Sequence, residues 1–163
     1  MTVANDFETL FKTQFPRLVS LGLAMTGRRD VATDLAQETL LRAHRRWAEV
    51  ATFDAPAAWC RKVMVNLLID HHRSAQAERV AVERLGARSE LATPAPALDR
   101  WCEIVGSLPD RQRVIVTLYY ADDLSVDEIA DTLGVTAGAV KASLFKARHS
   151  LRRRLDAEED HDG

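Results

Sequence analysis

The chain has 163 residues, of which 47% are hydrophobic and 28% charged, and its formal net charge is −2. This length suits one domain or two small ones, and the apolar fraction is ordinary for a protein with a buried core. Cys60 and Cys102 lie far apart without a CxxC spacing, so neither a disulfide framework nor a zinc site is expected.

The sequence also argues against membrane and enzyme classes. It has no basic leader followed by a long apolar run, and no stretch approaches the roughly 20 apolar residues that span a bilayer. We therefore expect a cytoplasmic protein. No P-loop, Rossmann glycine pattern, Ser/His/Asp set or metal-ligand cluster is present, and His71-His72 is interpreted as surface. Hence no enzyme activity, cofactor, metal or small-molecule substrate is expected.

Three helices are predicted in the first 74 residues. Apolar residues from Phe7 to Leu21 recur every three or four positions, and Gly27 is placed to end this first helix. Asp30 is placed to cap a second helix, which runs from about 31 to 50. After a turn at 53–56, a third helix is predicted from 57 to about 72.

Residues 75–97 have weak periodicity and end in Pro94 and Pro96, which favours a flexible linker. Fully extended, it would span roughly 70 Å. An amphipathic helix from Glu78 to Arg88 is an equally supported alternative. From Leu98 a helical stripe returns through Trp101 and Val105, is broken at 108–109, and continues from 111 to 121.

Residues 125–140 have the pattern of a helix-turn-helix. Ser125 and Glu128 form a capping-box signature at the start of the first helix. Gly134 stands where the turn needs a positive φ, and Thr136 is placed to cap the second helix. The apolar residues Ile129, Leu133, Val135 and Val140 supply a small core between the two helices.

Residues 136–155 carry six basic and no acidic residues, whereas 98–135 carry three basic and eight acidic ones. On a helical wheel of 136–155, one face is formed by Val140, Leu144, Ala147, Leu151 and Leu155. The opposite face carries the candidate duplex-DNA residues, which are Lys141, Ala142, Phe145, Lys146, Arg148 and Arg152.

Three alternatives stay open for this C-terminal part. The basic helix could be merely solvated or bind a membrane surface. Phe145 could contact a thymine methyl or fill the core. The acidic segment 156–163 could be disordered, or fold back and weaken DNA binding. The sequence thus predicts an all-α protein with two small helical domains, at 1–74 and 98–155, a flexible linker and an acidic tail.

Stretches in both halves of the chain resemble a known family. Leu108 to Arg113, with Leu124 to Ala130 and Gly138 to Lys141, looks like region 4 of the extracytoplasmic-function (ECF) sigma factors of the sigma-70 family. Residues 34–43 are similar to region 2.2 of that family, and residues 58–66 to region 2.3 running into 2.4. Both halves lie in the expected order. The chain therefore resembles an alternative sigma factor that directs core RNA polymerase to promoters.

The resemblance implies partners and sites. Region 2.2 would dock on the clamp helices of the polymerase β′ subunit through Asp34, Gln37, Glu38, Leu41, Arg42 and Arg45, which share one helix face. A solvated face with internal Glu38–Arg42 pairing is the alternative. The minus-ten strand would meet Trp59, Arg61, Lys62, Asn66 and Arg73, although Trp59 also suits a core. Region 4 would read duplex minus-thirty-five DNA and lie by the β flap, and an anti-sigma factor is the family's kind of inhibitor.

The sequence departs from the family pattern in two places. The connection between Phe53 and Trp59 is short and lacks the Gly-containing stretch of many relatives, a feature that resembles an actinobacterial subgroup. Ala142 and Ser143 stand where relatives often have Ser-Arg. Promoter preferences therefore do not carry over. Two further hypotheses are a stand-alone helix-turn-helix regulator and an adaptor whose basic helix binds an acidic protein.

Overall fold

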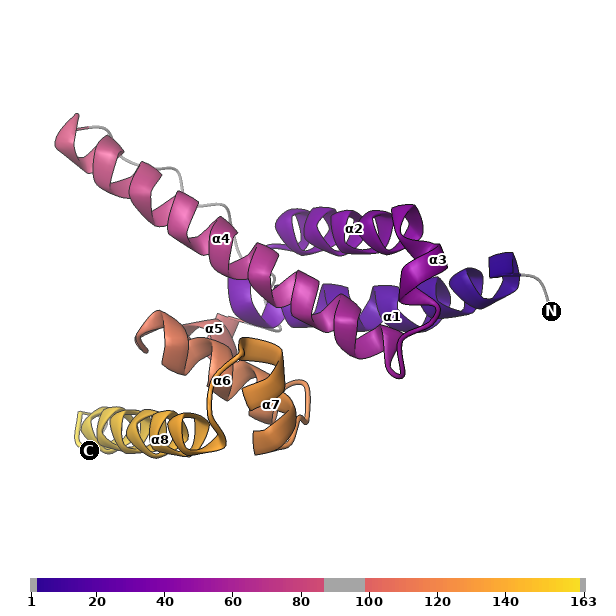
Figure 1. Cartoon of the computed structure of the whole chain (residues 1–163). Coiled ribbons are helices and arrows are strands. Elements are labelled where there is room, and N and C mark those ends of the chain that lie inside the picture. The colour runs from indigo at the N-terminus through magenta and orange to yellow at the C-terminus, as the bar shows by residue number, and fades with distance from the viewer. Residues whose placement is uncertain (1–2, 87–98, 162–163) are drawn as a thin grey trace. The chain divides into compact units, whose positions relative to one another are not determined.

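The computed structural model describes residues 3–86 and 99–161, and over these ranges it contains eight α-helices and no strand. The prediction of an all-α protein is confirmed. The chain divides into two units, Met1–Pro96 and Ala97–Gly163, each with its own core. In Figure 1 the helices α1 to α4 belong to the first unit and α5 to α8 to the second. In the described ranges, no helix is both long and apolar enough to cross a bilayer.

The first unit is a bundle in which α1 (Val3–Thr26) packs against both α2 (Arg29–Arg45) and α4 (Pro56–Arg84). The helices lie close together at Gly22, where an added Cβ would lie 2.7 Å from the Ala32 Cβ and 2.9 Å from the Met64 Cε. Because nothing larger than a hydrogen fits there, Gly22 sets the spacing of the three helices. The core of this unit comprises Leu18, Leu21, Leu23, Ala24, Ala32, Ala36, Leu40, Ala43, Val50, Cys60, Met64, Val65 and Leu68.

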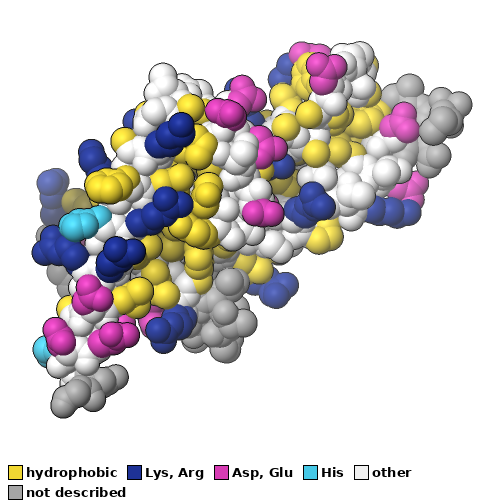
Figure 2. Space-filling model, turned by 90° about the horizontal axis from the view of Figure 1, so that it is seen from below, with side chains coloured by type: hydrophobic (Ala, Val, Ile, Leu, Met, Phe, Trp, Pro, Cys, Tyr) yellow, Lys and Arg dark blue, Asp and Glu magenta, His cyan; other side chains and the backbone are white. Residues whose placement is uncertain are grey.

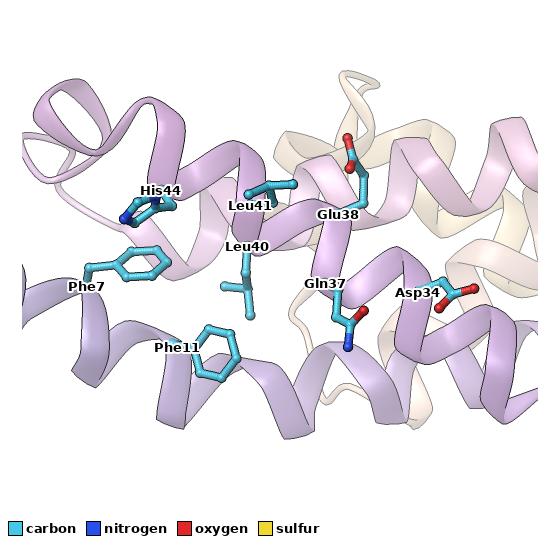
Figure 3. Close-up of a pocket in the computed structure, with 8 residues that line it drawn as sticks. All are labelled: Phe7, Phe11, Asp34, Gln37, Glu38, Leu40, Leu41 and His44. Atoms are coloured by element: carbon cyan, nitrogen blue, oxygen red, sulfur yellow. The ribbon is translucent and has the colours of Figure 1, made fainter.

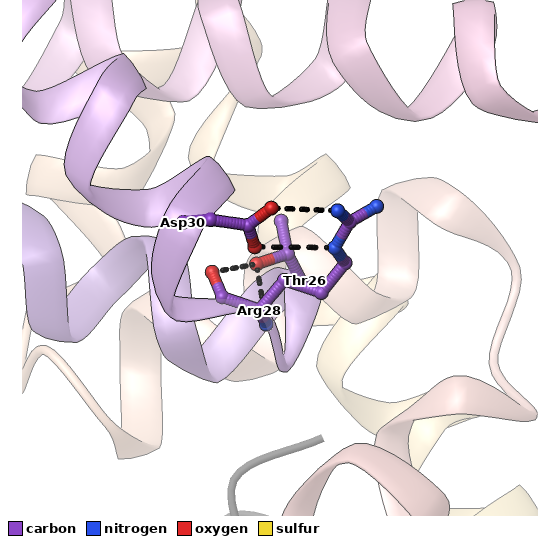
Figure 4. Close-up of polar contacts among 3 residues, drawn as sticks. All are labelled: Thr26, Arg28 and Asp30. Atoms are coloured by element: carbon purple, nitrogen blue, oxygen red, sulfur yellow. Dashed lines mark hydrogen bonds and ion pairs between the residues drawn. The ribbon is translucent and has the colours of Figure 1, made fainter. Parts of the chain in front are cut away.

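The connection between α1 and α2 is fixed by Gly27 and by polar contacts (Figure 4). Gly27 has φ 69°, as predicted for the end of α1. The Thr26 hydroxyl donates to the Gly22 carbonyl at 2.7 Å and accepts from the Arg28 amide at 3.1 Å. The prediction that Asp30 caps α2 is wrong. Arg28 is the N-cap residue without a side-chain cap, and Asp30 lies in the first turn, paired with Arg28 at 2.7 Å.

Two predicted helix boundaries need correction. The expected helix 31–50 is divided at Arg46, since α2 ends at Arg45 and the short α3 (Trp47–Val50) follows. The third helix does not end near 72, because α4 continues to Arg84, within the expected linker. The helical alternative for 78–88 is therefore correct up to residue 84, and residues 87–97 lie outside the described ranges. Pro56 occupies an N-terminal position of α4, as expected.

The second unit contains α5 (Asp99–Gly106), α6 (Asp110–Tyr120), α7 (Val126–Leu133) and α8 (Ala137–Glu159), with α8 packed on α6 and α7. All three local signals of the helix-turn-helix are confirmed: the capping box of Ser125 and Glu128, the left-handed Gly134 at φ 65°, and the Thr136 cap. The core comprises Val105, Leu108, Val114, Ile115, Val116, Leu118, Leu124, Ile129, Ala130, Val140, Leu144 and Ala147.

The last helix is longer than the sequence indicated. Residues up to Glu159 continue α8, so most of the acidic segment is helical and does not fold back over the basic residues. Arg154 pairs with Glu158 at 3.4 Å. Leu155, predicted on the buried face, is 41% exposed. The predicted position of Leu98 and the last two residues, 162–163, fall outside the described part of the chain.

Candidate functional site

The polar face of α8 presents an unbroken basic surface. The sequence-predicted residues on it, Lys141, Ala142, Phe145, Lys146, Arg148 and Arg152, are all exposed. Phe145 is 73% exposed, so its alternative role as a core residue is wrong. In the described part of the chain, neither Lys141 nor Lys146 forms an ion pair. Both charges therefore remain available to an external anion.

The basic residues of α8 are followed in the same helix by acids. Figure 2 shows Lys and Arg side chains followed by Asp and Glu side chains toward the tip of one elongated part of the surface. Between Lys141 and Glu159 the helix rises by about 27 Å. The acids therefore lie along the axis from Lys141 and do not cover it. This arrangement suits a phosphate-binding stretch of limited length.

Arg148 is held by two tyrosines that the sequence analysis did not single out. Its Nε donates to the Tyr120 hydroxyl at 2.7 Å, and its guanidinium lies over the Tyr119 and Tyr120 rings at 5.4 and 5.7 Å. The hydrogen bond to Tyr120 raises the pKa of Arg148. Tyr120 is 51% exposed. No local pattern could indicate this contact, because 28 residues separate Tyr120 from Arg148.

The three arginines at 152–154 have different surroundings. Arg152 and Arg153 are exposed. Arg154 instead donates through Nη1 to the Glu103 carbonyl in the last turn of α5 at 2.9 Å. This carbonyl belongs to the unsatisfied end of a helix, so Arg154 stabilises the contact between α8 and α5. Its charge is therefore partly committed within the protein.

The predicted minus-ten residues lie along α4 of the first unit. Lys62, Asn66 and Arg73 are exposed, and their spacing of four and seven positions places them on one side of the helix. Trp59 is half-buried, with its ring 6.3 Å from Phe53 and the Arg46 guanidinium 5.7 Å from its centroid. Trp59 therefore serves partly as packing.

Arg61 is half-buried and lies two positions from Trp59, which places it on another side of α4. The structure thus aligns Lys62, Asn66 and Arg73 but does not bring Arg61 to the same face. From Trp59 to Arg73 the helix rises by about 21 Å, a length over which several nucleotides of single-stranded DNA can lie.

The predicted polymerase face of α2 borders a groove against α1 (Figure 3). Leu41 is 43% exposed, and Asp34, Gln37, Arg42 and Arg45 are exposed around it. The expected pair of Glu38 with Arg42 is present, with Oε1 and Nε 2.7 Å apart. The groove is lined by Phe7, Phe11, Asp34, Gln37, Glu38, Leu40, Leu41 and His44.

Sequence reasoning missed the α1 side of this groove. Figure 3 shows Phe7 and Phe11 directed from α1 toward α2, with the Phe7 ring beside His44. These two rings have centroids 4.8 Å apart. Phe11 is 40% exposed and stacks on Phe15 at 5.4 Å. The four-residue spacing of the phenylalanines indicates one face of a helix but not what that face contacts.

Neither cysteine forms a disulfide. Cys60 is fully buried, and burial raises the pKa of its thiol to about 11. A thiol that stays protonated at neutral pH is unreactive. Cys60 is therefore a core residue of the first unit.

Comparison with known proteins matches both halves of the chain. Residues 10–78 match the family "Sigma-70 region 2", and residues 102–151 match "Sigma-70, region 4". The chain is 30% identical over 156 residues to the RNA polymerase sigma-E factor of Streptomyces avermitilis, covering 94% of this chain and 87% of that protein. It is 33% identical over 144 residues to the ECF RNA polymerase sigma factor SigL of Mycobacterium tuberculosis, covering 82% and 79%.

Solved structures resemble the chain as well. The sigma factor RpoE, in complex with the anti-sigma factor NepR from Bartonella quintana, has a TM-score of 0.71 and 25% identity, covering 93% of this chain and 97% of that one. CnrH, in complex with the cytosolic domain of CnrY, has the same TM-score at 23% identity, covering 94% and 90%. The latter shows a shared fold.

Proposed function

The chain belongs to the extracytoplasmic-function sigma factors of RNA polymerase, and on that premise we propose how its two units divide promoter recognition. As a sigma factor it binds core RNA polymerase and directs transcription initiation. The presence of both sigma regions in one chain carries this conclusion, because a stand-alone regulator would leave the region 2 match unexplained. We propose that it acts in the cytoplasm and catalyses no reaction of its own.

The second unit, in this proposal, reads duplex minus-thirty-five DNA with α8. Exposed Lys141, Lys146 and Arg152 neutralise phosphates, while Ala142 and Phe145 meet base edges. Phe145 has no polar atom, so its favoured partner is a thymine methyl group. Arg148 adds a charge at the side of the helix. The unit also lies by the β flap of the polymerase, as in the family.

The first unit opens the minus-ten region with α4. Lys62 and Arg73 supply charge on the exposed side of the helix, and Asn66 between them offers a donor and an acceptor to a base edge. Arg61 reaches the strand from the adjacent side. The edge of Trp59 provides a stacking surface.

Docking on the β′ clamp helices uses the exposed face of α2. Its centre is Leu41, surrounded by Asp34, Gln37, Glu38, Arg42 and Arg45. A small apolar anchor inside a ring of mixed charges is typical of a protein interface. Since charges of both signs alternate there, DNA is a poor partner for this face.

A protein inhibitor is the further partner that we propose. RpoE was solved in complex with the anti-sigma factor NepR, and the chain shares its fold over 93% of its length. A partner that covers the α2 face and the α8 face together would silence both proposed activities at once.

Run-off transcription tests the proposed function. Core RNA polymerase with the purified chain is incubated with a library of bacterial genomic fragments, and transcript ends are mapped. We expect discrete start sites that are absent with core enzyme alone. Lys146→Glu should reduce these transcripts at least about tenfold, whereas Lys12→Glu, an equal charge change on exposed α1, should not. Transcripts that do not depend on the chain would contradict the proposal.

A further inference from the structure

The contact between Tyr120 and Arg148 joins the end of α6 to the side of α8. Arg148 Nε donates to the Tyr120 hydroxyl oxygen at 2.7 Å, and the guanidinium lies over both tyrosine rings. A free arginine on a helix surface samples many rotamers, whereas this one is held by one hydrogen bond and two ring faces. The guanidinium plane therefore has a defined direction before any ligand arrives.

The bond to Tyr120 uses only one of the N–H donors of Arg148. A guanidinium has five N–H groups. Tyr120 engages the Nε–H and Tyr119 makes a weaker side-chain contribution, so most of the five donors remain. The Tyr120 hydroxyl accepts in this bond, so its own hydrogen can donate. The pair thus offers several donors and one full positive charge to an acceptor with several oxygens, which is the pattern of a phosphate.

Arg148 lies at the border of the basic face of α8. It follows the buried Leu144 by four positions and Lys141 by seven, so it lies on the side of α8 that adjoins α6. Ala142 and Phe145 lie nearer the middle of the exposed face. When a helix enters the major groove, its middle faces base edges and its sides face the sugar–phosphate strands.

We propose that Tyr120 and Arg148 form one composite site for a DNA backbone phosphate beside the minus-thirty-five element. Tyr120 is a positioning residue that aims the guanidinium, and Arg148 fixes the register of α8 on the duplex without reading a base. This proposal rests on the proposed function, since it requires α8 to lie on duplex DNA.

The acids near Tyr120 set the direction of approach. Asp123 and Glu128 line a shallow depression with Tyr119 and Tyr120, and Arg148 is not among its lining residues. A phosphate would be repelled from that depression. The phosphate therefore approaches Tyr120 from the α8 side, where the basic residues lie.

The test uses holoenzyme assembled from core RNA polymerase and the full chain. Its probe is a duplex selected from a random-sequence pool by the wild-type holoenzyme. Affinity is measured over a series of salt concentrations for the wild type, Arg148→Gln, Tyr120→Phe and the double variant. Tyr120→Phe keeps both ring contacts and removes only the hydroxyl. Lys12→Gln on exposed α1 is the control for the loss of one charge.

We expect Arg148→Gln to weaken binding about tenfold and to reduce the salt slope by about one. Tyr120→Phe should weaken binding about threefold with an unchanged slope, and should add little in the Arg148→Gln background. The loss in Arg148→Gln should be the same for every base substitution in the selected duplex. One methylphosphonate, placed at the contacted phosphate, should weaken the wild type and leave Arg148→Gln unaffected.

Two results overturn the composite phosphate site alone. One is wild-type affinity and salt slope in Arg148→Gln. The other is a loss of affinity that disappears when one base pair is changed, which would make Arg148 a base reader. Equal effects of Tyr120→Phe in both backgrounds would overturn the positioning role of Tyr120. A wild-type chain that forms no holoenzyme, or selects no duplex, contradicts the proposed function, and the composite phosphate site that rests on it.

Discussion

The exposed faces of α2 and α8 use charge in opposite ways. Along Arg29–Arg45 there are three acids and three arginines, and Glu38 pairs with Arg42. Along residues 137–155 there are six basic residues and no acid. Alternating charge beside an apolar groove suits another protein, whereas one uninterrupted sign suits phosphate. The difference shows why the net charge of the whole chain says little about its partners.

The two units also differ in how they are held together. The first depends on close helix approach at Gly22, and neither α2 nor α4 has a side-chain N-cap. In the second, Ser125 caps the eight-residue α7 and Thr136 caps the 23-residue α8. Helices of eight residues are too short to be stable alone, so capping has more influence there.

Reversing charge on α8 is the change with the largest expected effect. In Lys141→Glu/Lys146→Glu, two cations that form no ion pair with the described residues become anions. We expect affinity of the holoenzyme for promoter DNA to fall at least about a hundredfold, with a salt slope smaller by about two. Titration of labelled promoter at several salt concentrations measures both. Circular dichroism should show unchanged helix content. A loss below about threefold would remove α8 from the DNA interface.

The same glycine-to-alanine change should have opposite signs in the two units. Gly22→Ala places a Cβ within 3 Å of Ala32 and Met64, so we expect a loss of about 1 to 3 kcal/mol in the free energy of unfolding. Gly138→Ala, in the first turn of α8, meets only the Thr136 Oγ1 at 4.0 Å and should be neutral or stabilising by up to about 1 kcal/mol. Urea unfolding followed by circular dichroism measures both. Equal losses would refute the difference in packing.

Removing a cap should affect the second unit more than a comparable change affects the first. Ser125→Ala removes the acceptor of the Glu128 amide and should cost about 1 kcal/mol. Ser20→Ala, at an exposed site in the middle of α1, is the matched control and should change little. If thermal unfolding shows equal shifts for the two variants, capping does not distinguish the units.

The smallest expected effect concerns the turn between α1 and α2. The hydrogen bond from Arg28 lowers the pKa of Asp30. A carboxylate whose pKa is lower in the folded state stabilises the fold above its unfolded pKa, and this contribution disappears as the pH falls below about 4. Asp30→Asn should therefore lose a small part of the stability at pH 7 and show a flatter decline in acid. An unchanged acid transition would show that the pair is too exposed to contribute.

Local chemistry predicted the helix-turn-helix well, because caps and a left-handed glycine act within a few residues. Prediction from apolar spacing failed where tertiary packing or helix propensity decides the structure. Apolar spacing weakens beyond Leu68, yet residues 75–84 contain no Gly or Pro and are rich in Ala, Glu and Arg, so α4 continues to Arg84. Gly86, with φ 71°, follows its end.

The candidate site was predictable within single helices but not between them. Spacing placed Lys141, Phe145 and Lys146 on an exposed face, which the structure has. Spacing could not show that Tyr120 holds Arg148, nor that Phe7 lines the groove beside Leu41, because each contact joins different helices.

Association with core RNA polymerase tests the division of labour between the two units most directly. The full chain, labelled at one site, is titrated with core enzyme in the absence of DNA, alongside Leu41→Glu and Lys141→Glu/Lys146→Glu. Tight binding by the wild type and the α8 variant is predicted, with at least about tenfold weaker binding by Leu41→Glu, which puts a charge on the apolar anchor of α2. No binding by the wild type, or full binding by Leu41→Glu, would contradict it.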